Sequence, residues 1–120
     1  MGTPSEMRRL VEAIYAGKGL SPALAADIRR VLAVTKDSAF RVPLPETATI
    51  LDKPGSLEGV YCVTAVVDLP RRPYAVSIET TFLQRQEDGQ AAIREISAAL
   101  YEMFDRLSRS SDLGRVISER

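Results

Sequence analysis

Two apolar, β-branched runs separated by only four residues constrain the fold of this 120-residue chain more than any other feature. The runs are Gly59 to Leu69 (GVYCVTAVVDL) and Tyr74 to Leu83 (YAVSIETTFL), with Pro70-Arg71-Arg72-Pro73 between them. Such runs form strands, and a link this short joins antiparallel neighbours, because a parallel crossover needs many more residues. A shorter strand, Ala48 to Lys53, comes before them and ends at Pro54-Gly55, a dipeptide typical of turns. These strands predict an antiparallel three-stranded meander.

Helical patterns lie on both sides of the meander. Thr3 and Ser21 each precede a proline, and apolar residues follow both at helical spacing, which predicts one helix over 4–16 and a second beginning at Pro22. The residues expected on their buried stripes are Met7, Leu10, Val11, Ile14, Tyr15, Leu24, Ile28, Val31 and Leu32. After a polar link, Gln84 to Gly89, a helix of about twenty residues is expected. Its apolar stripe comprises Ile93, Ile96, Leu100, Met103, Phe104 and Leu107.

The element order α-α-β-β-β-α predicts an α+β fold, with helices packed on an antiparallel sheet. Lys36 to Thr47 is expected to be an irregular connector, and residues 108–120 a frayed tail. No repeat or linker divides the chain, so residues 1–120 are expected to form a single domain unit with one modest core.

Charge and composition exclude several function classes. Sixteen basic and sixteen acidic residues balance, and no basic stripe indicates nucleic-acid binding. The chain has no apolar run long enough to cross a membrane and no signal-peptide layout, so we expect a cytoplasmic location if it is made alone. With one cysteine and no histidine, neither an internal disulfide nor a usual transition-metal site is expected, and no cofactor is indicated.

The residues needed for covalent catalysis are also absent from the sequence. No serine stands three residues before any of the lysines Lys18, Lys36 and Lys53, and the chain has no asparagine. Neither a G-x-S-x-G elbow nor a glycine-rich phosphate loop occurs. We therefore expect no catalytic residue in this chain.

The segment Lys53-Pro54-Gly55-Ser56 is the strongest candidate site, and local sequence leaves two interpretations open. Lys53 could meet a ligand carboxylate at a sheet edge, with Gly55 allowing close approach to the backbone, or the segment could be an ordinary turn beside a solvated lysine. Other chemistry-bearing residues are better explained structurally. We expect turn charges at Arg71 and Arg72, a small buried side chain at Cys62, an exposed one at Glu79, and core positions for Tyr101, Met103 and Phe104.

Read together, the motifs and their order resemble the C-terminal part of class A β-lactamases and related penicillin-binding-fold serine hydrolases. The resemblance covers roughly residues 3 to 107 and is carried by their order and spacing more than by any one motif. The residues involved are Thr3-Pro4 with Met7, Leu20-Ser21-Pro22, Asp52 to Val60, Leu69 to Tyr74, Thr80-Thr81, and Ile93 to Ser97. A partial β-lactamase or transpeptidase-like fold is therefore expected.

The resemblance implies a substrate-binding role for the candidate segment. Lys53 would balance the charge of substrate and nucleophile, Gly55 would leave room for the acyl group, and the Ser56 N–H would serve an oxyanion hole. Pro54 departs from the family motif because it replaces the hydroxyl residue that would bond a substrate carboxylate, and its missing N–H requires a sheet edge. Tyr61 stands in the strand where many members carry a carboxylate-binding arginine.

Three hypotheses follow. In the first, the chain is part of a β-lactamase-like hydrolase, a family whose members are usually exported. It is inactive alone because the region with the nucleophile, expected N-terminal to it, is absent. A β-lactam-like or acyl substrate would then bind only together with that region. In the second, it is a non-catalytic interaction module that pairs through an open edge of its third strand, as a homodimer or with a complementing fragment. In the third, it is an unrelated α+β domain. The sequence does not identify a substrate.

Overall fold

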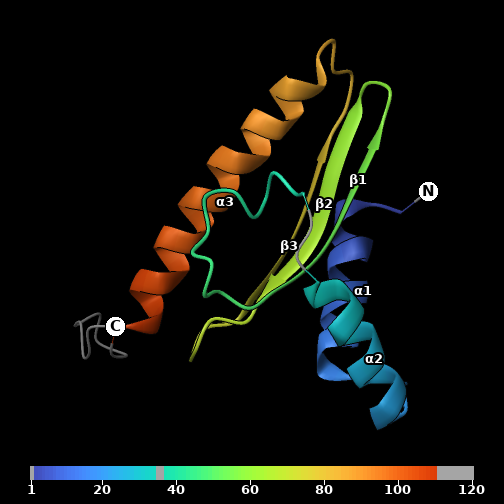
Figure 1. The fold of residues 1–120 in the computed structure, drawn as a ribbon, viewed down its shortest axis with the longest axis vertical. Coiled ribbons are helices and arrows are strands. Elements are labelled where there is room, and N and C mark those ends of the chain that lie inside the picture. The colour runs from blue at the N-terminus through green and yellow to red at the C-terminus, as the bar shows by residue number, and fades with distance from the viewer. Residues whose placement is uncertain (1, 35–36, 111–120) are drawn as a thin grey trace.

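The computed structural model describes residues 2–34 and 37–110 and confirms the α+β fold with the expected element order. In these residues the elements are α1 (Pro4–Ala16), α2 (Pro22–Ala33), β1 (Ile50–Leu57), β2 (Val60–Val67), β3 (Tyr74–Thr80) and α3 (Gln86–Ser108). The strands form an antiparallel sheet in the order β1-β2-β3. The sheet is a middle layer, with α3 on one face and α1 and α2 on the other (Figure 1).

The first two helices begin where their caps predict. The Oγ1 atom of Thr3 accepts a hydrogen bond from the N–H of Glu6, and the Oγ atom of Ser21 accepts one from the N–H of Leu24, both at 3.2 Å. Each cap satisfies a backbone donor that has no partner within the first helical turn. Gly17 then ends α1 in the left-handed conformation, at φ 73°.

The prediction of a turn at Pro54-Gly55 is wrong. Strand β1 continues through both residues to Leu57, and the hairpin turn falls at 58–59, where Gly59 has φ 73°. A proline is tolerated within this strand because β1 is an edge strand, so that the missing N–H need not break the ladder to β2. The strand also begins later than expected, at Ile50 instead of Ala48.

The junction between β3 and α3 also differs from expectation. Strand β3 ends at Thr80, not at Leu83, because Phe82 adopts a left-handed φ of 56° that a strand cannot accommodate. Helix α3 begins at Gln86, inside the expected polar link. The link is anchored to the β1–β2 turn, because the N–H of Leu83 donates to the Gly59 carbonyl at 3.0 Å.

The core lies mainly between α3 and the sheet. Ile93 of α3 is fully buried against the β2 residues Val63, Ala65 and Val67 and against Phe40 of the connector. The connector is irregular, as expected, but it supplies core residues that periodicity does not reveal. A smaller cluster of Val11, Leu51 and Val66 joins α1 to the opposite face of the sheet.

Several apolar positions expected in the core are exposed. Leu10, Leu24 and Val31 of the first two helices have 53%, 48% and 64% of their surface exposed, and Ala25 is buried instead. On α3 the residues facing the sheet are Ile93, Ser97, Leu100, Tyr101 and Phe104. Ile96, Met103 and Leu107 form a second stripe at the flank of α3, which is exposed because the sheet contacts only one side of the helix.

Two further features bear on the sequence hypotheses. Within the described residues β3 pairs only with β2, so its other edge is open, as expected. None of the described helices is long and apolar enough to span a membrane. Most of the expected tail, residues 111–120, lies outside the described residues, and Ser108 is a buried residue at the end of α3.

Candidate functional site

The candidate segment lies at the outer edge of the sheet. All four residues, Lys53 to Ser56, belong to β1, which has β2 on one side and no strand on the other among the described residues. The pleat directs alternate side chains to opposite faces. Lys53 and Gly55 therefore share the face on which α1 and α2 pack, whereas Pro54 and Ser56 share the face of α3.

Lys53 is exposed and lies in a row of polar residues that crosses the sheet. It is in register with Thr64 of β2, which is in register with Ser77 of β3. The hydroxyl groups of Thr64 and Ser77 are 2.9 Å apart and hydrogen-bonded. The Nζ atom of Lys53 donates a hydrogen bond to the Pro54 carbonyl at 2.8 Å.

Gly55 faces Cys62 across the β1–β2 ladder. A Cβ atom at position 55 would lie 3.2 Å from the Cys62 Sγ atom, closer than ordinary van der Waals contact. Cys62 is a free, half-buried cysteine, so it is less buried than expected. The glycine therefore accommodates the Cys62 sulfur at this position. The neighbouring Leu57 side chain on the same face is 75% exposed.

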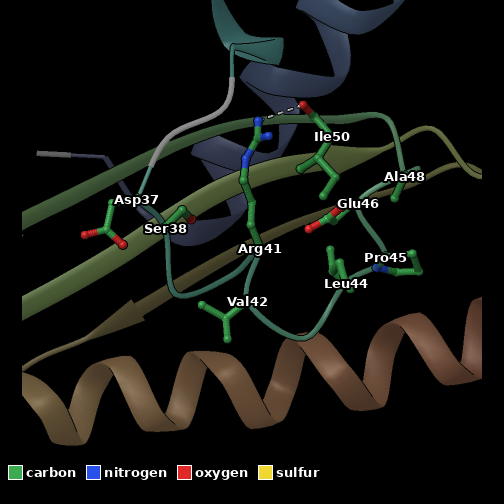
Figure 2. A pocket seen from close by; sticks show the side chains of 9 residues that line it. All are labelled: Asp37, Ser38, Arg41, Val42, Leu44, Pro45, Glu46, Ala48 and Ile50. Atoms are coloured by element: carbon green, nitrogen blue, oxygen red, sulfur yellow. Dashed lines mark hydrogen bonds between the residues drawn. The ribbon is translucent and has the colours of Figure 1, made fainter.

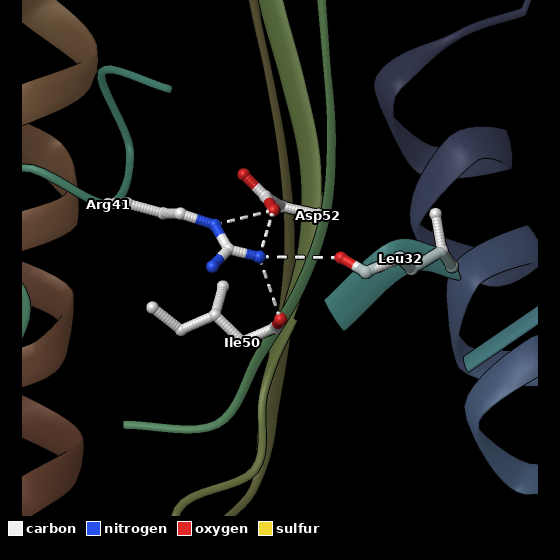
Figure 3. Close-up of polar contacts among 4 residues, drawn as sticks. All are labelled: Leu32, Arg41, Ile50 and Asp52. Atoms are coloured by element: carbon white, nitrogen blue, oxygen red, sulfur yellow. Dashed lines mark hydrogen bonds and ion pairs between the residues drawn. The ribbon is translucent and has the colours of Figure 1, made fainter. Parts of the chain in front are cut away.

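The backbone N–H of Ser56 points toward the outer edge. In an antiparallel ladder the N–H and C=O groups of one residue point to the same side and alternate between sides along the strand. The carbonyl of Ile50 accepts a hydrogen bond from Arg41 Nη2 at 3.0 Å, and this bond lies on the side of β1 away from β2 (Figure 3). Ser56 is an even number of residues further along β1, so its N–H has the same outward orientation.

Arg41 and Asp52 anchor this edge strand, and neither was identified from the sequence as a candidate. Asp52 is fully buried, and its Oδ1 atom accepts hydrogen bonds from Arg41 Nε at 2.8 Å and Nη2 at 2.7 Å. Arg41 Nη2 also donates to the Leu32 carbonyl at the end of α2, at 3.3 Å (Figure 3). One guanidinium thus joins the connector, α2 and β1 beside Lys53.

Comparison with known proteins places this geometry in a family. A family model described as the beta-lactamase enzyme family matches residues 1–104. The protein belongs to the β-lactamase family. A comparison with curated protein sequences gave no match.

Solved structures with the β-lactamase fold superpose closely on the chain. They include PBP-A (TM-score 0.79, 24% identity), the chromosome-encoded β-lactamase of Vibrio parahaemolyticus (0.77, 20%) and a β-lactamase from Sphaerobacter thermophilus (0.76, 24%). Each comparison covers 86% of this chain. The chain spans 40%, 41% and 40% of these structures respectively, less than half of each.

Two clefts lie beside strand β1, on the side of the sheet covered by α3. One, of about 260 Å³, reaches the candidate segment and is lined by Asp37, Ala39, Ser56, Tyr61 and Gln90. The other, of about 490 Å³, lies under the connector and contains no expected site residue (Figure 2). Its lining residues include Arg41 and Ile50, which are hydrogen-bonded to each other (Figure 2).

The remaining polar candidates fit structural roles. Arg71 and Arg72 are exposed in the turn after β2, and Glu79 is exposed on β3, all as expected. Tyr101 and Phe104 pack against the core, but Met103 is 47% exposed, so its expected core position is wrong. Within residues 2–34 and 37–110, no cluster of three or more potential metal-binding side chains occurs.

Two tyrosines have perturbed acidities. Burial, with a smaller contribution from Tyr101, raises the pKa of Tyr74, whose ring stacks on Phe104 with centroids 4.4 Å apart. A hydrogen bond from the Tyr15 hydroxyl to Asp68 Oδ1 at 2.6 Å, together with burial, raises the pKa of Tyr15. Both lie away from Lys53 to Ser56, so these shifts concern the stability of the fold.

Proposed function

We propose that this chain supplies the substrate-binding edge of a β-lactamase-like serine hydrolase. Strand β1 would form one wall of the acyl-binding site, with Lys53 as the cation, Gly55 as a position without a side chain and the Ser56 N–H as an oxyanion donor. The outward orientation of that N–H, on an exposed edge strand beside an exposed lysine, is the observation that carries the proposal.

The serine that forms the acyl-enzyme would come from another segment. The sequence has no Ser-x-x-Lys pair, and Ser77, the serine in the polar row of Lys53, is hydrogen-bonded to Thr64. One of the similar structures is described as a PBP-A variant in an acyl-enzyme complex with penicillin G. A β-lactam is therefore a suitable probe for β1.

Binding and turnover test this function separately. Penicillin G added to isotope-labelled chain should shift the amide resonances of Lys53, Gly55 and Ser56. Lys53→Met, which keeps the apolar stem, should weaken binding, whereas Arg72→Ala removes a distant turn charge and should not. The chain alone should not hydrolyse a chromogenic cephalosporin or retain a fluorescent penicillin covalently. Shifts confined to residues outside β1, or turnover that Lys53→Met abolishes, would contradict the proposal.

The open edge of β3 supports a second candidate, a non-catalytic module that pairs with a strand of another chain. The exposed stripe of Ile96, Met103 and Leu107 on α3 adds apolar surface near this half of the sheet. If the chain pairs with itself, amide exchange in β3 should slow as its concentration rises, while exchange in β1 stays constant. A monomer at all concentrations by light scattering would reject self-pairing.

A further inference from the structure

The cleft beside Ser56 has fixed walls. Tyr61 is 8% exposed, and its hydroxyl oxygen accepts a hydrogen bond from the N–H of Ala39 at 3.3 Å, which ties the connector to β2. One residue further, the Phe40 carbonyl accepts a hydrogen bond from the buried Ser97 hydroxyl of α3 at 2.6 Å. The connector is therefore held from both the sheet and the helix where it borders the cleft.

Close packing of α3 fixes the remaining wall. A Cβ atom at Gly89 would lie 2.6 Å from Leu83 Cδ1 and 3.1 Å from Tyr61 Cβ, so the absence of a side chain allows the helix to approach the sheet this closely. The following residue, Gln90, lines the cleft. A ligand group that enters would meet a preformed surface, with little loss of protein conformational entropy.

The chemistry of this surface suits an uncharged polar group. Its polar side chains are two hydroxyls (Ser56 and Tyr61), one carboxamide (Gln90) and one carboxylate (Asp37), and no described lining residue is cationic. The Tyr61 oxygen already accepts from Ala39, which leaves its proton to be donated to a ligand. Among the described lining residues a ligand carboxylate would find hydrogen-bond donors but no charge partner, and Asp37 would repel it.

We infer that the cleft of Asp37, Ala39, Ser56, Tyr61 and Gln90 makes β1 selective for acyl compounds that carry an uncharged hydrogen-bonding group, such as a carboxamide, in place of a carboxylate. This inference rests on the proposed function, because it takes β1 to be the substrate-binding wall. Lys53 does not line this cleft: its side chain leaves the opposite face of the sheet, and its Nζ atom is hydrogen-bonded to the Pro54 carbonyl.

A matched pair of ligands tests the selectivity. Penicillin G and its carboxamide analogue differ at one group, and both are titrated into isotope-labelled chain. The carboxamide should bind about fivefold more tightly, as expected for removal of one unfavourable charge contact near a protein surface. Its binding should shift the amide signals of Ala39, Ser56 and Gln90. Equal affinities, or tighter binding of penicillin G, would overturn the inference and leave the proposed function standing. If neither compound shifts β1 resonances, both fall.

Charge variants identify the cleft as the source of selectivity. Gln90→Arg adds a cation at a half-buried position and should reverse the preference, whereas Gln90→Met, of similar length and uncharged, should not favour the carboxylate. Asp37→Asn should reduce the preference to about twofold, because it removes the repulsion alone. Arg72→Ala, which removes an exposed charge in the distant turn after β2, should leave the ratio unchanged. Cooperative thermal unfolding verifies that each variant folds. Unchanged ratios in both Gln90→Arg and Asp37→Asn would contradict the inference.

Discussion

The carboxylate of Asp52 and the guanidinium of Arg41 meet at 2.7 Å next to Lys53, the cation of the candidate site. Asp52 has no exposed surface and the Arg41 side chain is 15% exposed, so water screens this ion pair little. The same guanidinium binds the carbonyls of Leu32 and Ile50. The pair therefore controls where the edge strand lies relative to α2 and the connector.

Loss of Arg41 should destabilise the protein strongly. Arg41→Met removes a guanidinium that binds a fully buried carboxylate, and we expect the free energy of unfolding in urea to fall by about 3 kcal/mol. Arg8→Met, which removes an exposed ion pair with Glu12 on α1, is the matched control and should cost about 0.3 kcal/mol. Combining Arg41→Met with Asp52→Asn should recover part of the loss. Similar costs for Arg41→Met and Arg8→Met would mean that the buried pair does not anchor β1.

Gly55 and Cys62 should be energetically coupled. The Cβ atom of Gly55→Ala would come within 3.2 Å of the Cys62 sulfur, so the substitution should cost about 1 kcal/mol of stability despite the greater strand propensity of alanine. Cys62→Ala removes the sulfur, and the cost of Gly55→Ala should then largely disappear. A double-mutant cycle measured by chemical unfolding gives the coupling energy directly. Additive effects would show that the sulfur does not limit the space at Gly55.

Whether Gly89→Ala raises or lowers the stability of the protein shows whether helix propensity or packing dominates at this position. Propensity alone would make alanine stabilising by about 1 kcal/mol in the interior of a helix. A Cβ atom there would lie 2.6 Å from Leu83 Cδ1 and 2.8 Å from Thr80 Oγ1, and overpacking of this kind costs about 2 kcal/mol. We therefore expect a lower thermal midpoint for Gly89→Ala. A higher midpoint would show that α3 can move away from the sheet without loss of stability.

Stability should decline in alkaline solution because of Tyr74. Burial raises its pKa above the ordinary value of 10.0, so the folded state keeps a proton that the unfolded chain releases near that pH. The free energy of unfolding should consequently fall as the pH rises above about 10, and Tyr74→Phe should reduce that fall.

The neutral-pH behaviour of two tyrosine variants provides the comparison. The Tyr74 hydroxyl has no hydrogen-bond partner among the described residues, so Tyr74→Phe should not reduce stability at neutral pH. Tyr15→Phe loses the hydrogen bond to Asp68 and should cost about 1 kcal/mol there. Unfolding curves measured at pH about 7 and about 11 distinguish the two variants. An identical alkaline decline in Tyr74→Phe and the unmodified chain would exclude Tyr74 as its cause.

Local signals predicted the elements, but long-range packing decided their ends and the site. Thr3 and Ser21 fix helix starts through bonds within one turn, and composition alone identifies β2. Pro54-Gly55 looks like a turn locally, and only its place at the edge of the sheet makes it strand. Asp52 offered a usable signal, because alternation puts this charge on the same face as Ile50, where it needs a partner. That the partner is Arg41 follows from tertiary structure.

The cleft was beyond sequence reasoning for the same reason. Its lining residues come from the connector, both strands of the hairpin and α3, and Asp37 and Gln90 are more than fifty residues apart in the chain. No periodicity or short motif connects them. The Lys53 to Ser56 segment could be proposed because its residues are contiguous and resemble a known motif, whereas the groups that surround it could not.

Strand β1 places Asp52 and Lys53 side by side in the chain but on opposite faces of the sheet. The residue that secures the strand and the residue that it offers to a ligand are thus mechanically separate, although one peptide bond joins them. Substitutions on the face of Lys53 can alter ligand preference, while Asp52 on the other face keeps the strand in position. Mutagenesis of Lys53 can therefore explore new binding specificities at little risk to folding, a freedom that Asp52 does not share.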